Sequence, residues 1–221
     1  MKILENLHTF IWQSTSANNC NSFLIDGPAR VLIDPGHREL FGHVEQGLGE
    51  LGLGVADIDL VICTHGHPDH LESIPLFKNG RTRVALHQTE WEWISTVGRP
   101  MAAAYGIDID SFNPDFFLNE GELSINGLDF QVIHTPGHSP GSVCLYWPDH
   151  KALFTGDLVF KQGVGRTDLP GGNGEQLKDS IKRLTHLEVE YVLPGHGDIV
   201  SSAKEVQTNF TEIENYWFKV I

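Results

Sequence analysis

Short apolar runs alternate along the chain with longer segments in which apolar residues recur at helical spacing. The run Leu60-Val61-Ile62-Cys63-Thr64 is apolar and rich in β-branched residues, which is typical of a strand buried on both faces. Segments such as 175–187 show the period of an amphipathic helix instead. The pattern predicts strands at 8–13, 20–26, 30–34, 60–64, 83–87, 116–118, 123–125, 128–134, 142–147, 151–155 and 191–193, and helices at 39–51, from the loop after Thr64 to about 78, at 88–97, 175–187 and 203–221.

The order of these elements is strands followed by mixed strands and helices, roughly twice over. No Ser- or Pro-rich linker separates the halves, so we expect one compact α/β domain spanning residues 1–221. Residues 99–114 fit neither period well. We expect a short helix and a loop there, of the kind that often covers a substrate cleft.

Composition narrows the class of protein. The chain has 29 acidic and 15 basic residues, a net charge of −14 and no Lys/Arg-rich run, which argues against a nucleic-acid partner. The N-terminus lacks the apolar region of a signal peptide, and no stretch approaches about 18 uninterrupted apolar residues, so we expect no membrane span. Three widely spaced cysteines do not suggest a disulfide framework, and we expect a cytoplasmic protein. The 12 histidines, several beside Gly, Pro or Asp, direct attention to a metal site.

The strongest chemical signal directly follows the buried strand at 60–64. It reads Thr64-His65-Gly66-His67-Pro68-Asp69-His70 and holds four potential metal ligands in six residues. Residues two apart in an extended segment point the same way, so the first two histidines can bind one ion together. Pro68 suits the first turn of a helix, from which Asp69 and His70 can reach a second ion. A loop of solvent-exposed histidines is the simpler interpretation for one His, but not for four ligands in this order.

Three later segments place a ligand-type residue beside glycine after an apolar strand. Glycine permits tight turns and close backbone approach, and strand ends are where a rigid scaffold presents reactive groups. Each segment alone is also compatible with an ordinary turn, but together with the histidine motif they indicate one site. They are His134-Thr135-Pro136-Gly137-His138-Ser139, Leu153-Phe154-Thr155-Gly156-Asp157 and Leu193-Pro194-Gly195-His196-Gly197.

The order of these motifs resembles the metallo-β-lactamase superfamily, and the match extends from Asn21 to about Gly197. The resemblance implies a four-layer α/β/β/α sandwich with two metal ions at one edge of its two sheets. It further implies that His65, His67 and His138 bind the first ion, that Asp69, His70 and His196 bind the second, and that Asp157 bridges them.

Further residues refine the resemblance. Asp34, in Leu32-Ile33-Asp34-Pro35-Gly36, resembles an acid that orients the ligand loop, although a plain turn residue fits equally. The segment 165–172, with Arg166 and Asp168, resembles the glyoxalase II-like branch, which includes thioesterases and persulfide dioxygenases; a surface ion pair is the alternative. Asp157 separates the chain from β-lactamases with a Cys ligand. The chain ends 25 residues after His196, so the glutathione-binding helical extension of typical glyoxalase II enzymes is not carried over.

The resemblance implies a reaction. Two divalent ions, zinc first with iron or manganese as alternatives, would supply a bridging hydroxide that attacks a thioester carbonyl, with Asp69 or Asp157 holding the nucleophile's proton. Arg166 would pair with a substrate carboxylate or, as we prefer, with Asp168. The expected partner is a small thioester such as an acylglutathione, which the positive site would favour in anionic form. A homodimer is compatible with the sequence, since symmetric dimers are common.

Two other functions compete with the hydrolase. A persulfide dioxygenase would use one Fe(II) held by His65, His138 and Asp157, a triad with open positions for O₂. The retained second set of ligands favours the hydrolase over it. A non-catalytic metal protein is disfavoured because structural zinc sites are closed and rich in Cys, whereas this set has no Cys and too many ligands for one ion.

Overall fold

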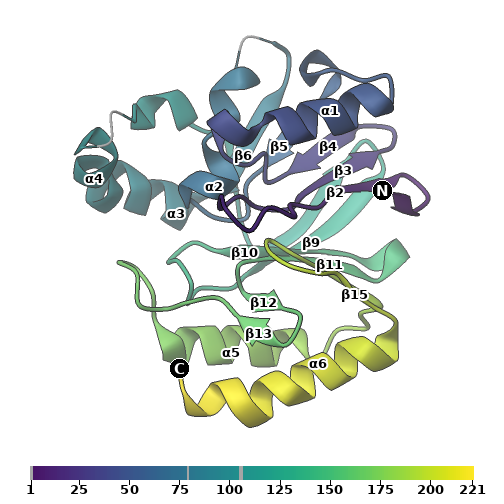
Figure 1. Ribbon diagram of the computed structural model, residues 1–221, viewed down its shortest axis with the longest axis vertical. Helices are drawn as coiled ribbons and strands as arrows, with labels where there is room; N and C mark the ends of the chain where they lie inside the picture. Colours follow the sequence, from purple (N-terminus) through teal and green to yellow (C-terminus); the bar gives the residue numbers. More distant parts are fainter. Residues whose placement is uncertain (1, 79, 105–106) are drawn as a thin grey trace.

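The chain folds around two large β-sheets that lie face to face (Figure 1). The computed structural model describes residues 2–78, 80–104 and 107–221. The first sheet is antiparallel over its first four strands and parallel over its last four. Its strands, in spatial order, are β1 (Lys2–Leu4), β2 (Leu7–Phe10), β3 (Ser22–Asp26), β4 (Arg30–Ile33), β5 (Leu60–Ile62), β6 (Arg83–His87) and β7 (Phe116–Leu118).

The second sheet has six strands and is antiparallel apart from one parallel pair, β11 with β14. In spatial order its strands are β15 (Val200–Ser201), β14 (Tyr191–Pro194), β11 (Ala152–Gly156), β10 (Val143–Trp147), β9 (Leu128–His134) and β8 (Gly121–Ile125). A separate small hairpin of β12 (Val159–Phe160) and β13 (Gly163–Val164) follows β11.

Helices cover the outer faces of the two sheets (Figure 1). Those over the first sheet are α1 (Gly42–Glu50), α2 (Pro68–Leu71), α3 (Gln88–Trp93) and α4 (Arg99–Ala104), with the π-helical turn η4 (Ile94–Gly98) and the 3₁₀ turns η1 (Arg38–Leu40), η2 (Val55–Asp57), η3 (Ile74–Leu76) and η5 (Ile109–Phe112). Those over the second sheet are α5 (Gly174–Leu184) and α6 (Ala203–Tyr216), and the 3₁₀ turns η6 (Pro148–His150) and η7 (Trp217–Lys219) complete the set.

Three hydrophobic clusters account for this layering. One lies between the sheets, where the rings of Phe23 and Phe154 meet edge to face at 5.4 Å. A second packs α1 and its neighbours on the first sheet through side chains such as Val44 and Leu48. A third packs α5 and α6 on the second sheet. Burial on both faces of each sheet gives the α/β/β/α order, and the fold that the sequence predicts is confirmed.

Most predicted elements occur within a few residues of their predicted bounds, and the differences have local causes. The sequence missed β1, β15 and the β12–β13 hairpin, because strands of two or three residues show no periodicity. The single helix predicted up to residue 78 is wrong: α2 ends at Leu71 and a 3₁₀ turn containing Pro75 follows. Proline has no backbone N–H to continue the helical hydrogen bonds.

The helix predicted at 88–97 is longer than expected. It runs through α3 and the π-helical turn into α4, so described residues 88–104 form one helical segment. The wider π-helical turn η4 continues the helix past Gly98, whereas the sequence pattern predicted that the helix ends at residue 97. The loop predicted within 99–114 contains the 3₁₀ turn η5. Residues 105–106 of this predicted segment lie outside the described residues.

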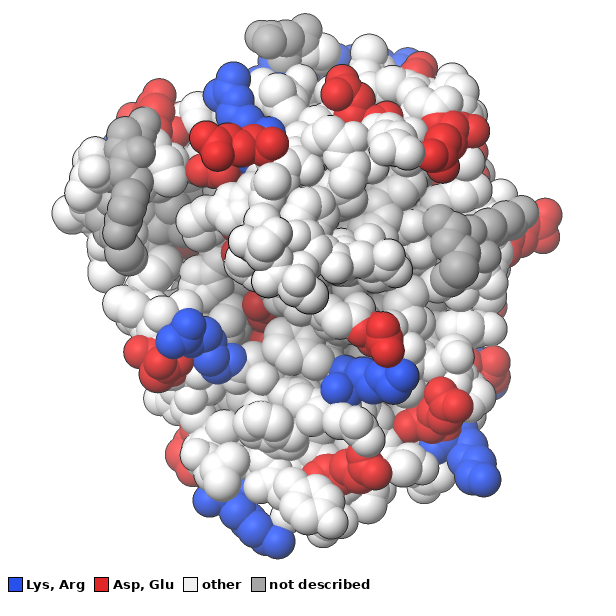
Figure 2. Space-filling view, in the orientation of Figure 1, with Lys and Arg blue, Asp and Glu red and all other residues white. Residues whose placement is uncertain are grey.

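The surface shows no strong separation of charge on the face drawn in Figure 2, where acidic and basic side chains are interspersed. Among the described residues, no helix is both long enough and apolar enough to cross a membrane.

Candidate metal centre

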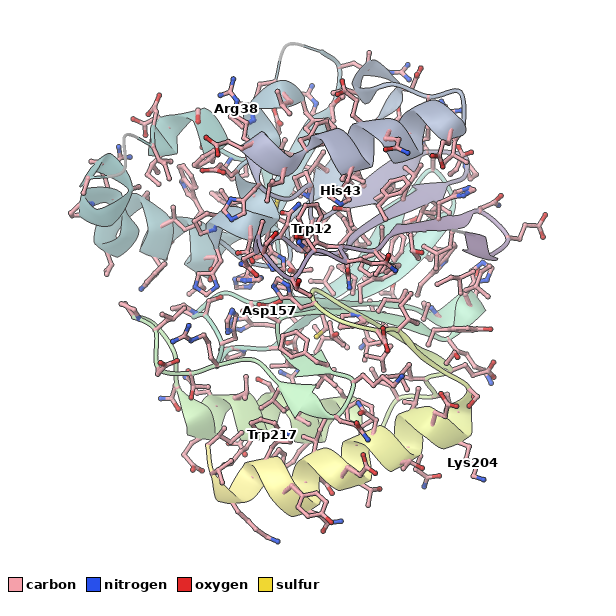
Figure 3. The ribbon with its side chains drawn as sticks, in the orientation of Figure 1. Trp12, Arg38, His43, Asp157, Lys204 and Trp217 are labelled. Atoms are coloured by element: carbon pink, nitrogen blue, oxygen red, sulfur yellow. The ribbon has the colours of Figure 1, made fainter. Side chains whose placement is uncertain are left out.

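The candidate ligands lie in loops that follow strands at one edge of the sandwich. His65 and His67 follow β5, and Asp69 and His70 lie on α2 directly after them. Pro68 is the first residue of α2, as its type and position predicted. From the second sheet, His138 follows β9, Asp157 follows β11 and His196 follows β14. In Figure 3, Asp157 lies where the upper and lower halves of the molecule meet, and Figure 2 shows a hollow at this level.

Three histidines converge as a first group. The Nε2 atom of His65 lies 3.0 Å from Nδ1 of His67, and that same Nδ1 lies 2.8 Å from Nε2 of His138. The ligand atoms of the group all lie within 4.8 Å of one another. Two nitrogens bound to one tetrahedral zinc at about 2.0–2.1 Å would be about 3.3 Å apart, so the observed spacing is close to that of a metal site.

A second group consists of Asp69, His70 and His196. The Nε2 atom of His196 lies 3.2 Å from Oδ2 of Asp69, and Nε2 of His70 lies 3.9 Å from the same oxygen. Asp157 reaches both groups. Its Oδ1 is 3.2 Å from Nε2 of His70, while its Oδ2 is 3.3 Å from Nε2 of His196 and 3.5 Å from Nε2 of His138. The seven residues singled out from the sequence therefore lie together, with Asp157 between the two groups.

Two atoms at this centre show what the site suits. Nε2 of His70 and Oδ1 of Asp157 are buried and lie 3.2 Å apart, yet neither makes a hydrogen bond of acceptable geometry with the other or with any other described residue. Unsatisfied polar atoms of this kind are rare in folded proteins because each costs about 1–3 kcal/mol. A metal ion would satisfy both. Imidazole nitrogens and carboxylate oxygens are ligands that zinc, iron and manganese accept, so the His and Asp groups suit a binuclear metal site.

Neighbouring groups fix the orientation of three of the histidine rings. Nδ1 of His138 contacts the backbone oxygen of Arg166 at 2.8 Å, and Nδ1 of His65 contacts the Thr64 hydroxyl at 3.1 Å. Nδ1 of His70 lies 2.9 Å from Oδ2 of Asp34. Each contact leaves Nε2 aimed at the centre, the arrangement that metal-ligating histidines commonly show.

Asp34 connects the first sheet to the ligand loop. It is buried, and its backbone adopts the left-handed conformation, with φ of 54°. Its Oδ1 accepts a hydrogen bond from the backbone N–H of Thr64 at 2.7 Å, and its Oδ2 accepts one from the Thr64 hydroxyl at 2.8 Å. Together with the contact to His70, these bonds favour an orienting role for Asp34 over that of a plain turn residue.

The pKa values divide the histidines into two kinds. Burial, with neighbouring imidazoles, lowers the pKa of His65 well below its ordinary value, and burial lowers that of His67 to about 4. These rings are neutral, as ligation requires. His70 and His196 differ: burial opposes their charge, but Asp157 and Asp69 outweigh it, raising the pKa of His70 well above its ordinary value and that of His196 to about 9. Without metal, the protonated rings of His70 and His196 therefore form ion pairs with the carboxylates of Asp157 and Asp69.

This difference predicts proton release when metal binds. Adding Zn²⁺ to metal-free protein at pH 7 should release at least about two protons per chain, because His70 and His196 must deprotonate to become ligands. The affinity of the second ion should therefore fall as the pH drops from 9 to 6, more steeply than that of the first. Calorimetric titration in buffers of different ionisation enthalpy measures the release, and binding without released protons would contradict the assignment.

Glu90, on α3, was missed by the sequence analysis. It is fully buried and its carboxylate connects both ligand loops: Oε1 accepts from the Gly66 backbone N–H at 2.8 Å, and Oε2 accepts from the Gly141 N–H at 2.6 Å and the Ser139 hydroxyl at 2.9 Å. Burial raises the pKa of Glu90 despite these three donors. Gly66 separates His65 from His67, and Ser139 follows His138, so Glu90 sets the distance between ligands from different sheets.

Replacing Glu90 with glutamine should weaken metal binding about 10- to 100-fold, the usual cost of losing an outer hydrogen-bond partner of a metal site. The amide –NH₂ would face an N–H donor and leave at least one buried donor unpaired. Competition with a chromophoric chelator measures the affinity. The matched control is Glu92→Gln, because Glu92 is exposed on the same helix and its side chain bonds Gln88. Equal affinities in the two variants would refute the role.

Two asparagines of the segment before β3 were also missed. Asn18 donates to Oδ2 of Asp69 at 2.7 Å. The side chain of Asn21 donates to the backbone oxygens of Pro194 at 3.0 Å and Gly197 at 2.9 Å, on either side of His196. The signal in the sequence was three asparagines in the four residues 18–21, an unusual density of polar side chains beside a strand.

Arg166 and Asp168 lie at the rim of the site and pair with each other. The guanidinium makes two bonds of 2.7 Å to the Asp168 carboxylate, and both side chains are exposed. This is the internal pairing that the sequence analysis preferred to a contact with substrate.

A two-sheet sandwich with paired His/Asp groups at its edge defines a class of binuclear metalloprotein, and sequence comparison places the chain within it. The model of the metallo-β-lactamase superfamily matches residues 15–196, and the chain belongs to that superfamily. Its relatives include metallo-hydrolases.

Individual relatives are similar over most of the chain. A probable metallo-hydrolase of Bacillus subtilis, YqgX, is 37% identical over 79% of this chain and 83% of its own length. The hydroxyacylglutathione hydrolase GloC of Haemophilus influenzae is 33% identical over 86% of this chain and 91% of its own. Among solved structures, TTHA1623 in a di-iron-bound form is 36% identical, with a TM-score of 0.69, over 86% of this chain and 93% of that one.

Proposed function

We propose that this protein hydrolyses a small thioester at a binuclear metal centre. The observation that carries the proposal is the convergence of His65, His67 and His138 on one side of Asp157 and of Asp69, His70 and His196 on the other. A structural site needs one closed set of four ligands. Seven ligands in two groups, with His67 and His196 partly exposed, suit chemistry instead.

Each residue of the centre has a separate role in this proposal. His65, His67 and His138 would hold the first ion, Asp69, His70 and His196 the second, and Asp157 both. Ions bound there would lower the pKa of a bound water to about 7 and polarise a carbonyl oxygen. Asp34 and the backbone oxygen of Arg166 keep the His70 and His138 rings aimed at the centre.

The carboxylates of Asp69 and Asp157 are the acid–base groups of this proposal. Burial raises the pKa of each, but neighbouring histidines, His70 first, outweigh it and hold both pKa values below their ordinary range. Both groups are therefore ionised at neutral pH and able to accept a hydrogen bond from the attacking water. Asn18 holds one oxygen of Asp69 in place for this.

Similarity to known proteins supports a thioester substrate. It leaves three candidate metals, which are zinc, iron and manganese. GloC is a hydroxyacylglutathione hydrolase, which cleaves a thioester, and the chain resembles it over most of its length. Zinc is the metal we propose first. TTHA1623 binds two irons, which makes iron a specific alternative, and manganese accepts the same ligands. We further propose a cytoplasmic enzyme with a small-molecule partner rather than a nucleic acid or a membrane, in line with its acidic charge and its free, buried cysteines; a homodimer is compatible with this.

A substrate panel tests the proposed function. Protein loaded separately with zinc, iron or manganese is given acyl thioesters, their oxygen-ester counterparts and glutathione persulfide, while thiol release and oxygen uptake are followed. Thiol release from thioesters without oxygen uptake is the expected result. Oxygen uptake with the persulfide, in protein holding one iron per chain, would replace the hydrolase with the dioxygenase that uses His65, His138 and Asp157.

A further inference from the structure

An apolar pocket adjoins the metal centre through the ligand loop itself. Gly66 and His67 form one end of it, and its volume is about 280 Å³. This is near the lower end of the range for small-ligand pockets. Its walls are apolar side chains of α2, η4, α4 and η5, of Ile107 and of the loop before α5, among them Leu71, Ile94, Ala102, Phe112 and Leu169.

The walls are built onto the ligand loop and onto each other. Ile94 packs so closely on Gly66 that a Cβ there would lie 2.2 Å from its Cδ1. On the opposite side, a Cβ at Gly171 would lie 3.1 Å from the Trp93 ring. In Figure 1 the loop before α5 reaches up toward α3 and α4. Side chains of this loop and of both helices line the pocket.

The charged groups around the pocket are engaged elsewhere. Glu72 lines it, but its Oε2 is bonded to Nδ1 of His37 at 2.8 Å and to the backbone N–H of Arg38. Arg99 follows the lining residue Gly98 and makes two bonds to Asp110. Arg166, three residues before Leu169, makes two bonds to Asp168.

We propose that this pocket binds the acyl chain of the substrate, and that the chain is aliphatic or aromatic and uncharged. The inference rests on the proposed thioesterase function and names its substrate class. The guanidinium groups of Arg99 and Arg166 are each already paired with a carboxylate, so neither is free to bind the carboxylates of glutathione. A charged group would also lose its hydration inside the pocket without gaining a partner. The carrier half of a thioester is usually its polar half and can remain in the open hollow. One water takes about 30 Å³ in the liquid, so by this measure the pocket holds a chain of up to roughly nine non-hydrogen atoms.

A series of acyl chains on one small thiol, such as N-acetylcysteamine, tests this. We expect kcat/KM to rise about fourfold per methylene from acetyl to hexanoyl and then level off, since each buried methylene is worth about 0.8 kcal/mol. A second series keeps the acetyl group and lengthens the thiol, and it should be flat. A flat acyl series, or a rise in the thiol series instead, would overturn the assignment.

Variants locate the effect in the pocket. Ala102→Phe fills it and should lower kcat/KM for the hexanoyl thioester at least tenfold while leaving the acetyl thioester within about threefold. Ala103→Phe is the matched control, because Ala103 is exposed on the same helix. Leu169→Ala, which shortens a partly buried side chain of the pocket wall, should move the optimum to chains one or two carbons longer. If both phenylalanine variants behave alike and Leu169→Ala leaves the optimum unchanged, the inference fails.

A binding measurement separates this inference from the proposed function. Hexanamide, which is uncharged and is not a thioester, should quench Trp93 fluorescence in the wild type and in Ala103→Phe, and not in Ala102→Phe; acetamide should not bind. Hexanamide binding together with no hydrolysis of any thioester would sink the proposed function and leave an apolar ligand pocket. Thioester hydrolysis together with no hexanamide binding would overturn the pocket alone.

Discussion

Replacing Asp157 with alanine is expected to reduce the bound metal from about two ions per chain to at most one and to lower hydrolysis about 10³-fold. Within the described part of the chain, Asp157 is the one carboxylate whose oxygens face both ligand groups, at 3.2 Å from His70, 3.3 Å from His196 and 3.5 Å from His138. Losing the stabilisation supplied by a correctly placed ion costs several kcal/mol of the barrier, and each 1.36 kcal/mol is a factor of ten in rate.

The control for this prediction is Asp129→Ala, which removes an exposed carboxylate from β9. Elemental analysis gives the metal content and the thioester assay gives the rate. Asp157→Asn keeps the shape of the side chain and separates loss of charge from loss of packing. Full activity in Asp157→Ala would end the two-metal scheme.

Gly195→Ala is expected to give the second large loss of hydrolysis rate, and the cause is a steric clash alone. A methyl group at this position would lie 2.3 Å from Oδ1 of Asp157 and 2.7 Å from Cε1 of His70. The loop cannot withdraw freely, because Gly195 N–H donates to the Gly156 oxygen at 2.8 Å and its own oxygen accepts from Asn21 N–H at 2.6 Å. Asp157 and His70 must therefore shift, and a shift of about 1 Å in a catalytic group costs on the order of 10²-fold in rate.

Gly49→Ala is the matched glycine control. A Cβ there meets no heavy atom within 4 Å, and the position is exposed on α1. It should leave metal content and rate unchanged and stabilise the helix by about 0.5–1 kcal/mol. Thermal unfolding, metal content and rate are measured for both variants. Two bound ions and an unchanged rate in Gly195→Ala would show that the centre is looser than the distances indicate.

The sequence was most informative where the chemistry is local. The motif around His65 predicted which side chains lie together because strand and helix periodicity act over a few residues, and the structure brings them together with His138, Asp157 and His196. Glu90 could not be found in this way. Its partners Gly66 and Gly141 lie 24 and 51 residues away, and an acidic residue on a helix is most often a solvated one.

The substrate side was predicted less well than the ligands. The segment 99–114 was expected to cover a cleft, and several of its described residues do line the apolar pocket. Trp93 lies in the same pocket wall. Tryptophan at helical spacing looks alike in a core and in a ligand pocket, so only the tertiary packing distinguishes the two.

If two metal ions in this centre drive thioester hydrolysis, the rate must depend on both ions. The most direct test is the hydrolysis rate of a simple acyl thioester as Zn²⁺ is added back to metal-free protein. We expect negligible activity without metal and a rate that reaches its plateau at about two equivalents per chain. Full activity in the metal-free protein, or no thioester hydrolysis when two ions are bound, would contradict it.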